Sequence, residues 1–83
     1  MVGSAKPEKP FVREMTAADI REPKGADSIE VIFLESARFY RLRRNNAAFE
    51  RILAMLRESV AKSRAVKVRF ASIESDVIQN VEE

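Results

Sequence analysis

The sequence of 83 residues contains no cysteine, histidine or tryptophan, and it has only two glycines. Without cysteine, the chain can form neither a disulfide framework nor a thiolate nucleophile. Without histidine, it can build no Ser-His-Asp triad and no imidazole general base, and a zinc site would have to consist of carboxylates alone. The sequence therefore predicts a protein that is not an enzyme and that holds no metal ion and no cofactor.

Long apolar runs and clustered glycines are also missing. Gly3 and Gly25 lie too far apart for a Walker loop or a dinucleotide-binding fingerprint, because both motifs need several glycines close together. The longest apolar run, residues 31–34, is far shorter than a membrane span, and residues 1–10 lack the apolar core of a secretory signal. We therefore expect a cytoplasmic protein that does not bind membranes.

The composition is that of a folded chain, with 46% hydrophobic and 34% charged residues. A chain of this length has room for one small core. Residues 1–10 contain two of the three prolines and show no apolar periodicity. We therefore predict a flexible N-terminal arm over residues 1–10 and a single small domain over residues 11–83.

Strand patterns occur at both ends of this domain. Residues 11–20 favour extended structure over a short capped helical turn, and Pro23 and Gly25 then mark a turn. Residues 66–72 alternate cleanly between apolar and polar side chains, as a half-buried strand does. Residues 77–81 predict a weaker final strand.

Residues 28–42 give the strongest strand signal, because they are rich in Ile, Val, Phe and Tyr. The polar pair Glu35-Ser36 interrupts this segment, which favours a hairpin over one long bent strand. Residues 29–34 are apolar at every position but Glu30, and this pattern predicts a strand that is central in the sheet or covered on both faces.

The segment 46–63 predicts an amphipathic helix. Asn side chains at positions 45 and 46 are typical of a helix start, because their oxygens accept hydrogen bonds from the N–H groups of the first turn. Apolar side chains then recur at helical spacing. These predicted core positions are Phe49, Ile52, Leu53, Leu56 and Val60.

The predicted fold is therefore α+β, with a small antiparallel sheet of four to five strands and one amphipathic helix in the order β-β-β-α-β-β. This is also the element order of the oligonucleotide/oligosaccharide-binding fold, whose helix lies between the third and fourth strands. A barrel needs glycines or bulges to turn its corners, and glycine is scarce in this chain. An open sheet is therefore favoured slightly over an OB-like barrel.

Charge is strongly segregated along the chain, although the net charge is only +2. Residues 38–69 contain ten basic and two acidic side chains, whereas the segments before and after them are acidic overall. Basic groups interleaved with aromatic rings suit single-stranded nucleic acid, because cations follow phosphates and rings stack on bases. The candidate nucleic-acid-binding residues are Arg38, Tyr40, Arg41, Arg43, Arg44, Lys67 and Arg69.

A simpler interpretation competes with this one. If residues 37–42 form a strand, Arg38 and Tyr40 share one face while Phe39 and Arg41 share the other, so no single surface collects both rings and both cations. One aromatic side chain would then be core, and the arginines would form a solvated face paired with the acidic segments.

The leading functional hypothesis from sequence is a non-enzymatic interaction module. It rests on the small core, the strand that is apolar on both faces and the lack of catalytic residue types. Its partner would be another protein or a second copy of the chain in a homodimer. The alternative is an OB-like module that binds single-stranded nucleic acid through the basic segment 38–69.

Overall fold

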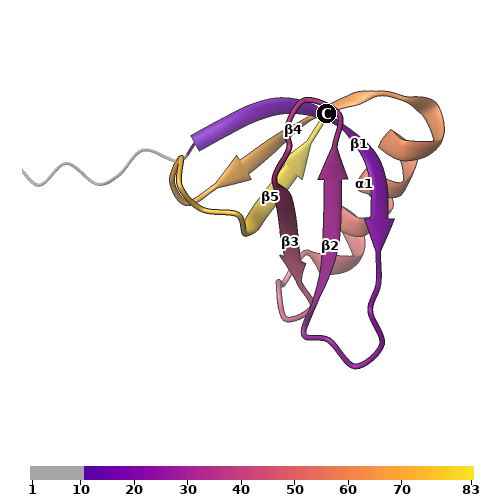
Figure 1. Cartoon of the computed structure of the whole chain (residues 1–83), viewed down its shortest axis with the longest axis vertical. Helices are drawn as coiled ribbons and strands as arrows, with labels where there is room; N and C mark the ends of the chain where they lie inside the picture. The colour runs from indigo at the N-terminus through magenta and orange to yellow at the C-terminus, as the bar shows by residue number, and fades with distance from the viewer. Residues whose placement is uncertain (1–10) are drawn as a thin grey trace, which may run out of the picture.

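The computed structural model describes residues 11–83, and the arm predicted for residues 1–10 lies outside the described residues. The described chain forms five strands and one helix in the predicted order (Figure 1). These elements are β1 (Phe11–Arg21), β2 (Ser28–Phe33), β3 (Phe39–Arg43), α1 (Phe49–Lys62), β4 (Ala65–Phe70) and β5 (Ile78–Glu82).

The strands form one antiparallel sheet in the order β3-β2-β1-β4-β5. This confirms the predicted small α+β fold with an open sheet. The sheet curls so far that its two edges meet at one point, where Arg41 and Val77 form an isolated bridge. There the Arg41 backbone N–H donates to the Asp76 carbonyl over 2.8 Å.

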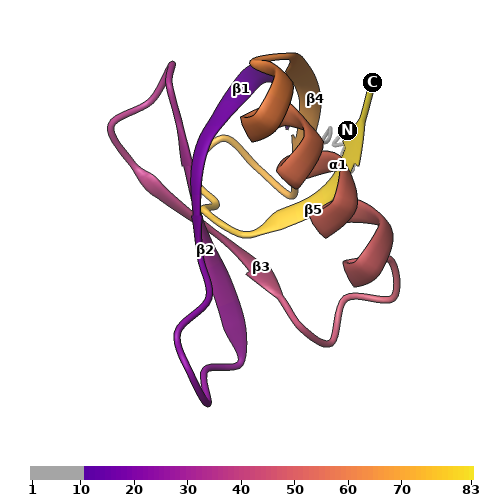
Figure 2. The same ribbon diagram turned by 90° about the vertical axis from the view of Figure 1, so that its right-hand side faces the viewer.

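The core lies between the concave face of the sheet and α1, which packs against β1, β4 and β5 (Figure 2). Alternation along the strands turns every second side chain toward this core. The inward positions predicted in β4 are confirmed, since Val66, Val68 and Phe70 are all buried. Residues of β2 and β3 complete the core with Ile29, Val31, Phe33, Tyr40 and Leu42.

Of the two alternatives for residues 29–34, the central position is the one observed, because β2 lies between β3 and β1 in the sheet. The strand is covered on one face only. Ile29, Val31 and Phe33 are buried, but Ile32 is only half-buried and Leu34 is 69% exposed. The described chain has a single helix, and that helix covers the concave face, so no element packs on the convex face of β2.

The helix begins three residues later than predicted, at Phe49. The Asn46 side-chain oxygen accepts the Ala48 N–H over 2.8 Å, which holds the chain in a turn before the helix starts. The apolar stripe also differs at its far end, because Val60 is 36% exposed while Ser59 is buried. Ser59 lies in the core in place of Val60 because its hydroxyl is needed there for a hydrogen bond.

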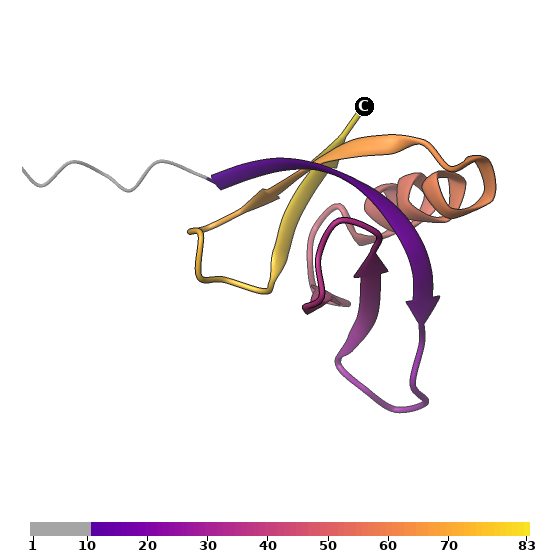
Figure 3. The ribbon, with the colours of Figure 1, turned by 45° about the horizontal axis from the view of Figure 1, so that its top comes forward.

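The need for this hydrogen bond arises where β1 changes its pairing partner from β4 to β2. β1 pairs with β4 up to Thr16 and with β2 from Ala17 onward, with an irregularity in the register after Ala17. At this junction the Thr16 N–H donates to Glu35 Oε1 over 2.7 Å, and the Ala17 N–H donates to Ser59 Oγ over 2.9 Å. Two side chains thus satisfy backbone donors at the bend of this long bowed strand (Figure 3).

The Glu35 bond is expected to make stability depend on pH. The hydrogen bond from the Thr16 backbone is the main cause that holds the pKa of the Glu35 carboxyl below its ordinary value of 4.5. A pKa that is lower in the folded state adds stability above the unfolded pKa, and this is lost as the pH falls through the folded pKa. Urea unfolding across this range should therefore show a wild-type advantage over Glu35→Gln that disappears in acid.

Glu14→Gln provides the matched control for this prediction. Glu14 is exposed on β1, and its side chain makes no hydrogen bond or ion pair within residues 11–83. Its replacement removes the same charge and should change the free energy of unfolding by less than about 0.5 kcal/mol. A difference between wild type and Glu35→Gln that stayed constant down to strongly acidic pH would contradict the role given to the ionised carboxylate.

Candidate functional site

The convex face of β3 carries outward basic side chains and one outward aromatic ring. Tyr40 and Leu42 point into the core, so Phe39, Arg41 and Arg43 point outward along the strand. β2 lies beside β3 and pairs Ile32 with Phe39 at one end of this surface. The two strands therefore present an apolar end at Phe39 and a basic end at Arg43.

A polar hollow of about 560 Å³ lies at the basic end, between the start of β2 and the end of β3. Three arginines and one aspartate supply its charged groups, so positive charge is in excess. The lining residues are Asp27, Ser28, Arg41, Arg43, Arg44 and Asn45. Guanidinium groups gathered in this way suit carboxylate or phosphate oxygens, which they can bind in a bidentate manner.

The arginines around the hollow differ in how firmly they are held. Arg44 Nε donates to the Ala26 carbonyl over 3.0 Å, and its guanidinium lies 5.7 Å from the centre of the Phe49 ring. Within residues 11–83 the Arg43 side chain makes no hydrogen bond and no ion pair. Arg44 is thus anchored to the fold, whereas Arg43 keeps all its donors for a ligand.

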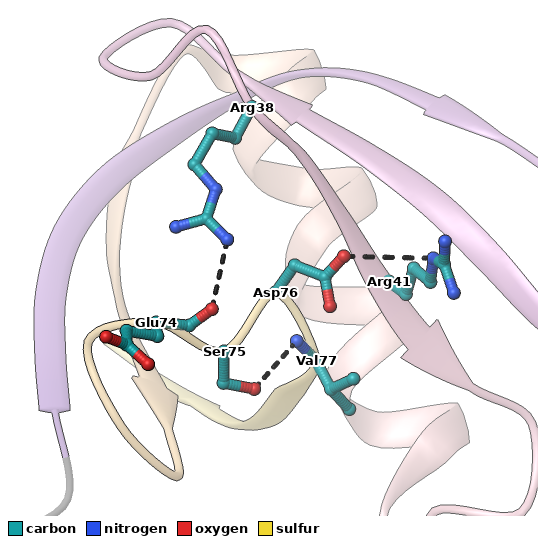
Figure 4. Close-up of polar contacts among 6 residues, drawn as sticks. All are labelled: Arg38, Arg41, Glu74, Ser75, Asp76 and Val77. Carbon is teal, nitrogen blue, oxygen red and sulfur yellow. Dashed lines mark hydrogen bonds and ion pairs between the residues drawn. The ribbon is translucent and has the colours of Figure 1, made fainter.

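A second group of contacts ties β3 to residues 74–77, just before β5 (Figure 4). Arg38 Nη2 donates to the Glu74 carbonyl over 3.2 Å, and Arg41 Nε lies 3.9 Å from Asp76 Oδ2. Both contacts are exposed, so each contributes little to stability. The Arg41–Asp76 contact is one charge pair of the kind that the simpler interpretation expects.

The structure brings only some of the candidate nucleic-acid-binding residues together. Arg41, Arg43 and Arg44 line one hollow, and Arg38 lies on the neighbouring contact with Glu74. Lys67 and Arg69 lie on β4, which β2 and β1 separate from β3 within the sheet.

Tyr40 is not available to stack on a base. It is only 2% exposed, and its ring centre lies 5.4 Å from that of Phe33 and 5.1 Å from that of Phe70. Its hydroxyl lies 3.0 Å from Ser36 Oγ. Tyr40 is therefore a core residue, because alternation places it on the same face as Leu42.

The sequence reasoning missed the apolar part of this surface. Phe39 is 55% exposed, and the Arg21 guanidinium lies 6.0 Å from the centre of its ring. The signal was present, since an inward Leu42 requires an inward Tyr40 and therefore an outward Phe39.

Two other features of the described residues bear on the site. Residues 11–83 contain no group of three or more acidic, histidine or cysteine side chains that could hold a metal ion. In the same part of the chain, no helix has both the length and the apolar character needed to cross a membrane.

The fold is similar to part of the solved structures of an enzyme. No protein-family model matches the sequence. No curated protein matches it either. A crystal structure of pro-protein-glutaminase superimposes with a TM-score of 0.76 at 26% identity, covering 94% of this chain and 26% of that chain. A mutant of pro-protein-glutaminase gives a TM-score of 0.72 at 22% identity, covering 88% of this chain and 26% of that one.

These similarities correct the function predicted from sequence. The predicted non-enzymatic interaction module, which would act through protein–protein contact or self-association, and its nucleic-acid-binding alternative are contradicted, because the solved structures that the chain resembles are those of an enzyme, pro-protein-glutaminase. Composition and charge carry no signal for this similarity, because it lies in the arrangement of the strands and the helix. The chain spans about a quarter of the length of the solved structures that it matches.

Proposed function

We propose that this chain is a folded pro domain of a protein-glutaminase-like enzyme precursor, which keeps the catalytic part inactive until it is removed. The observation that carries the proposal is the match to pro-protein-glutaminase, which takes in 94% of this chain but only 26% of the other. The chain thus corresponds to one folded part of such a precursor, with most of the precursor outside it.

The residue types present support a pro domain over a catalytic one. A glutaminase hydrolyses a side-chain amide, and this reaction commonly uses a Cys or Ser nucleophile with a His that transfers the proton. The present sequence has neither cysteine nor histidine. We therefore assign the chemistry to the part of the precursor that this chain does not match, and we retain the prediction that the chain itself is not an enzyme.

The partner in this proposal is the catalytic part of the same precursor. It takes the place of the second protein or second copy expected from the sequence. The cytoplasmic location expected from residues 1–10 and from the missing apolar runs stays a prediction, which fractionation of the source cells would test.

A chimera tests the proposed function directly. This chain would replace the matched segment of pro-protein-glutaminase, and ammonia release from a glutamine-containing peptide would be measured before and after protease treatment. A linked domain acts at an effective concentration of about millimolar, so even a weak match between pro domain and enzyme should be seen. We expect at least about tenfold lower activity in the intact chimera, regained on removal of the pro domain.

Two controls make the result decisive. The catalytic part alone gives the uninhibited rate, and a chimera carrying an unrelated folded domain of equal length measures simple steric obstruction. Full activity of the intact chimera, with circular dichroism showing a folded pro domain, would contradict the proposal. So would equal inhibition by the unrelated domain.

A further inference from the structure

We propose, resting on the function above, that the convex face of β3 and the hollow at its end bind an extended acidic segment of the precursor's catalytic part. This surface runs from Phe39 to Arg43, which at about 3.4 Å per residue is about 14 Å long. A length of this kind accommodates about five residues of extended chain.

The arginines at the basic end of this surface favour a ligand that carries carboxylates. Arg41 already has Asp76 at 3.9 Å, which leaves Arg43 and Arg44 facing Asp27 across the hollow. With Asp76 counted beside Asp27, the three arginines of the hollow still carry one positive charge without a counterpart. The Arg43 side chain makes no hydrogen bond or ion pair within residues 11–83. Its planar guanidinium group can therefore bind a carboxylate in bidentate geometry.

The apolar end of this surface favours a protein segment over a small anion as the ligand. Phe39 is 55% exposed, Ile32 lies opposite it on β2, and Leu34 follows at 69% exposed. Exposed apolar side chains beside arginines are typical of protein interfaces, in which aromatic residues and Arg are enriched. A free phosphate would use the hollow alone and leave this end uncovered.

The same two ends argue against nucleic acid as the occupant. Stacking on single strands relies on several rings along a basic groove, and here Phe39 is the one outward aromatic side chain of β3. Asp27 inside the hollow and Glu30 opposite Arg41 would repel a continuous line of phosphates. Separate carboxylates on a peptide can avoid both acidic groups.

The first experiment tests the site with no enzyme present. A five-residue peptide of one leucine followed by alternating serine and glutamate would be titrated into the labelled chain, with amide shifts recorded at low and high salt. We expect salt-sensitive shifts at Phe39, Arg43 and Arg44, and none with the same peptide carrying glutamine for glutamate. Shifts confined to other strands, or tighter binding of an oligonucleotide of equal charge, would overturn the proposal.

Charge reversal then identifies the residue responsible. Arg43→Glu should weaken binding of the acidic peptide by about tenfold. Arg69→Glu is the matched control, because Arg69 is also an exposed strand arginine whose side chain makes no hydrogen bond or ion pair within residues 11–83. It lies on β4, two strands away from β2 in the sheet, and should leave peptide binding within about twofold of wild type.

The chimera links the site to the enzyme. Arg43→Glu in the intact chimera should raise its residual activity, whereas Arg69→Glu should not. If the wild-type chimera is latent and Arg43→Glu changes neither its residual activity nor peptide binding, this inference is overturned and the proposed function still stands. A fully active wild-type chimera would overturn the proposed function, and with it the assignment of the segment to the enzyme.

Discussion

Replacement of Phe70 with alanine is expected to lower the free energy of unfolding by about 3–5 kcal/mol. Phe70 is 1% exposed, and its ring centre lies 5.1 Å from that of Tyr40 and 6.3 Å from that of Phe11. Tyr40 belongs to β3, which is not a neighbour of β4 in the sheet. The Phe70 ring therefore joins the two halves of the curled sheet across the core, and its loss opens a cavity there.

Phe39→Ala is the control for this prediction, because it removes the same side chain from the convex face. Phe39 is 55% exposed, so its replacement should cost no more than about 1 kcal/mol. Urea unfolding followed by circular dichroism measures both variants. If Phe70→Ala lowers the free energy of unfolding by less than about 1 kcal/mol, the packing of β4 against β3 does not depend on the contact between Phe70 and Tyr40.

The same variant connects stability to the proposed function. Small domains have free energies of unfolding of about 5–10 kcal/mol, so Phe70→Ala removes a large share of the total. A pro domain acts only while it is folded. A chimera with Phe70→Ala should therefore lose latency on mild warming, at a temperature where the wild-type chimera stays inactive.

Much of the fold could be predicted from sequence because its signals are local. The alternation of residues 66–72 and the apolar spacing of residues 49–56 each depend on neighbours within a few positions, and both are confirmed. The hairpin around Glu35-Ser36 is confirmed for the same reason. The sequence left open whether the strand 29–34 is central or covered on both faces, because this depends on how many elements pack against the sheet rather than on the strand itself.

The candidate site was predictable only in part. Density of arginine along the chain pointed to Arg41, Arg43 and Arg44, and the structure places these three residues around one hollow. It also pointed to Lys67 and Arg69, which lie on a different strand, because charge counted along a sequence ignores which strands become neighbours. Asp27 and Ser28 reach the hollow only through the pairing of β2 with β3.

Ser59 shows most clearly where a local pattern fails. It stands beside Val60, and helical spacing alone favours the valine as the core residue. Ser59 is nevertheless 1% exposed, because its Oγ accepts the Ala17 N–H over 2.9 Å and donates to the Arg64 carbonyl over 2.5 Å. The need for this hydroxyl arises 42 residues away, at the bend of β1, where no sheet partner meets the Ala17 N–H.

Ser59→Ala should therefore cost about 1–3 kcal/mol, which is the range for leaving a buried backbone donor without a partner. Ser63→Ala removes the same hydroxyl from an exposed position one turn later and should change stability by less than about 0.5 kcal/mol. Hydrogen exchange locates the effect, because the Ala17 amide should exchange faster in Ser59→Ala by more than the global loss explains. Unchanged protection at Ala17 would mean that the bend of β1 holds without this bond, and that Ser59 is buried only by its neighbours.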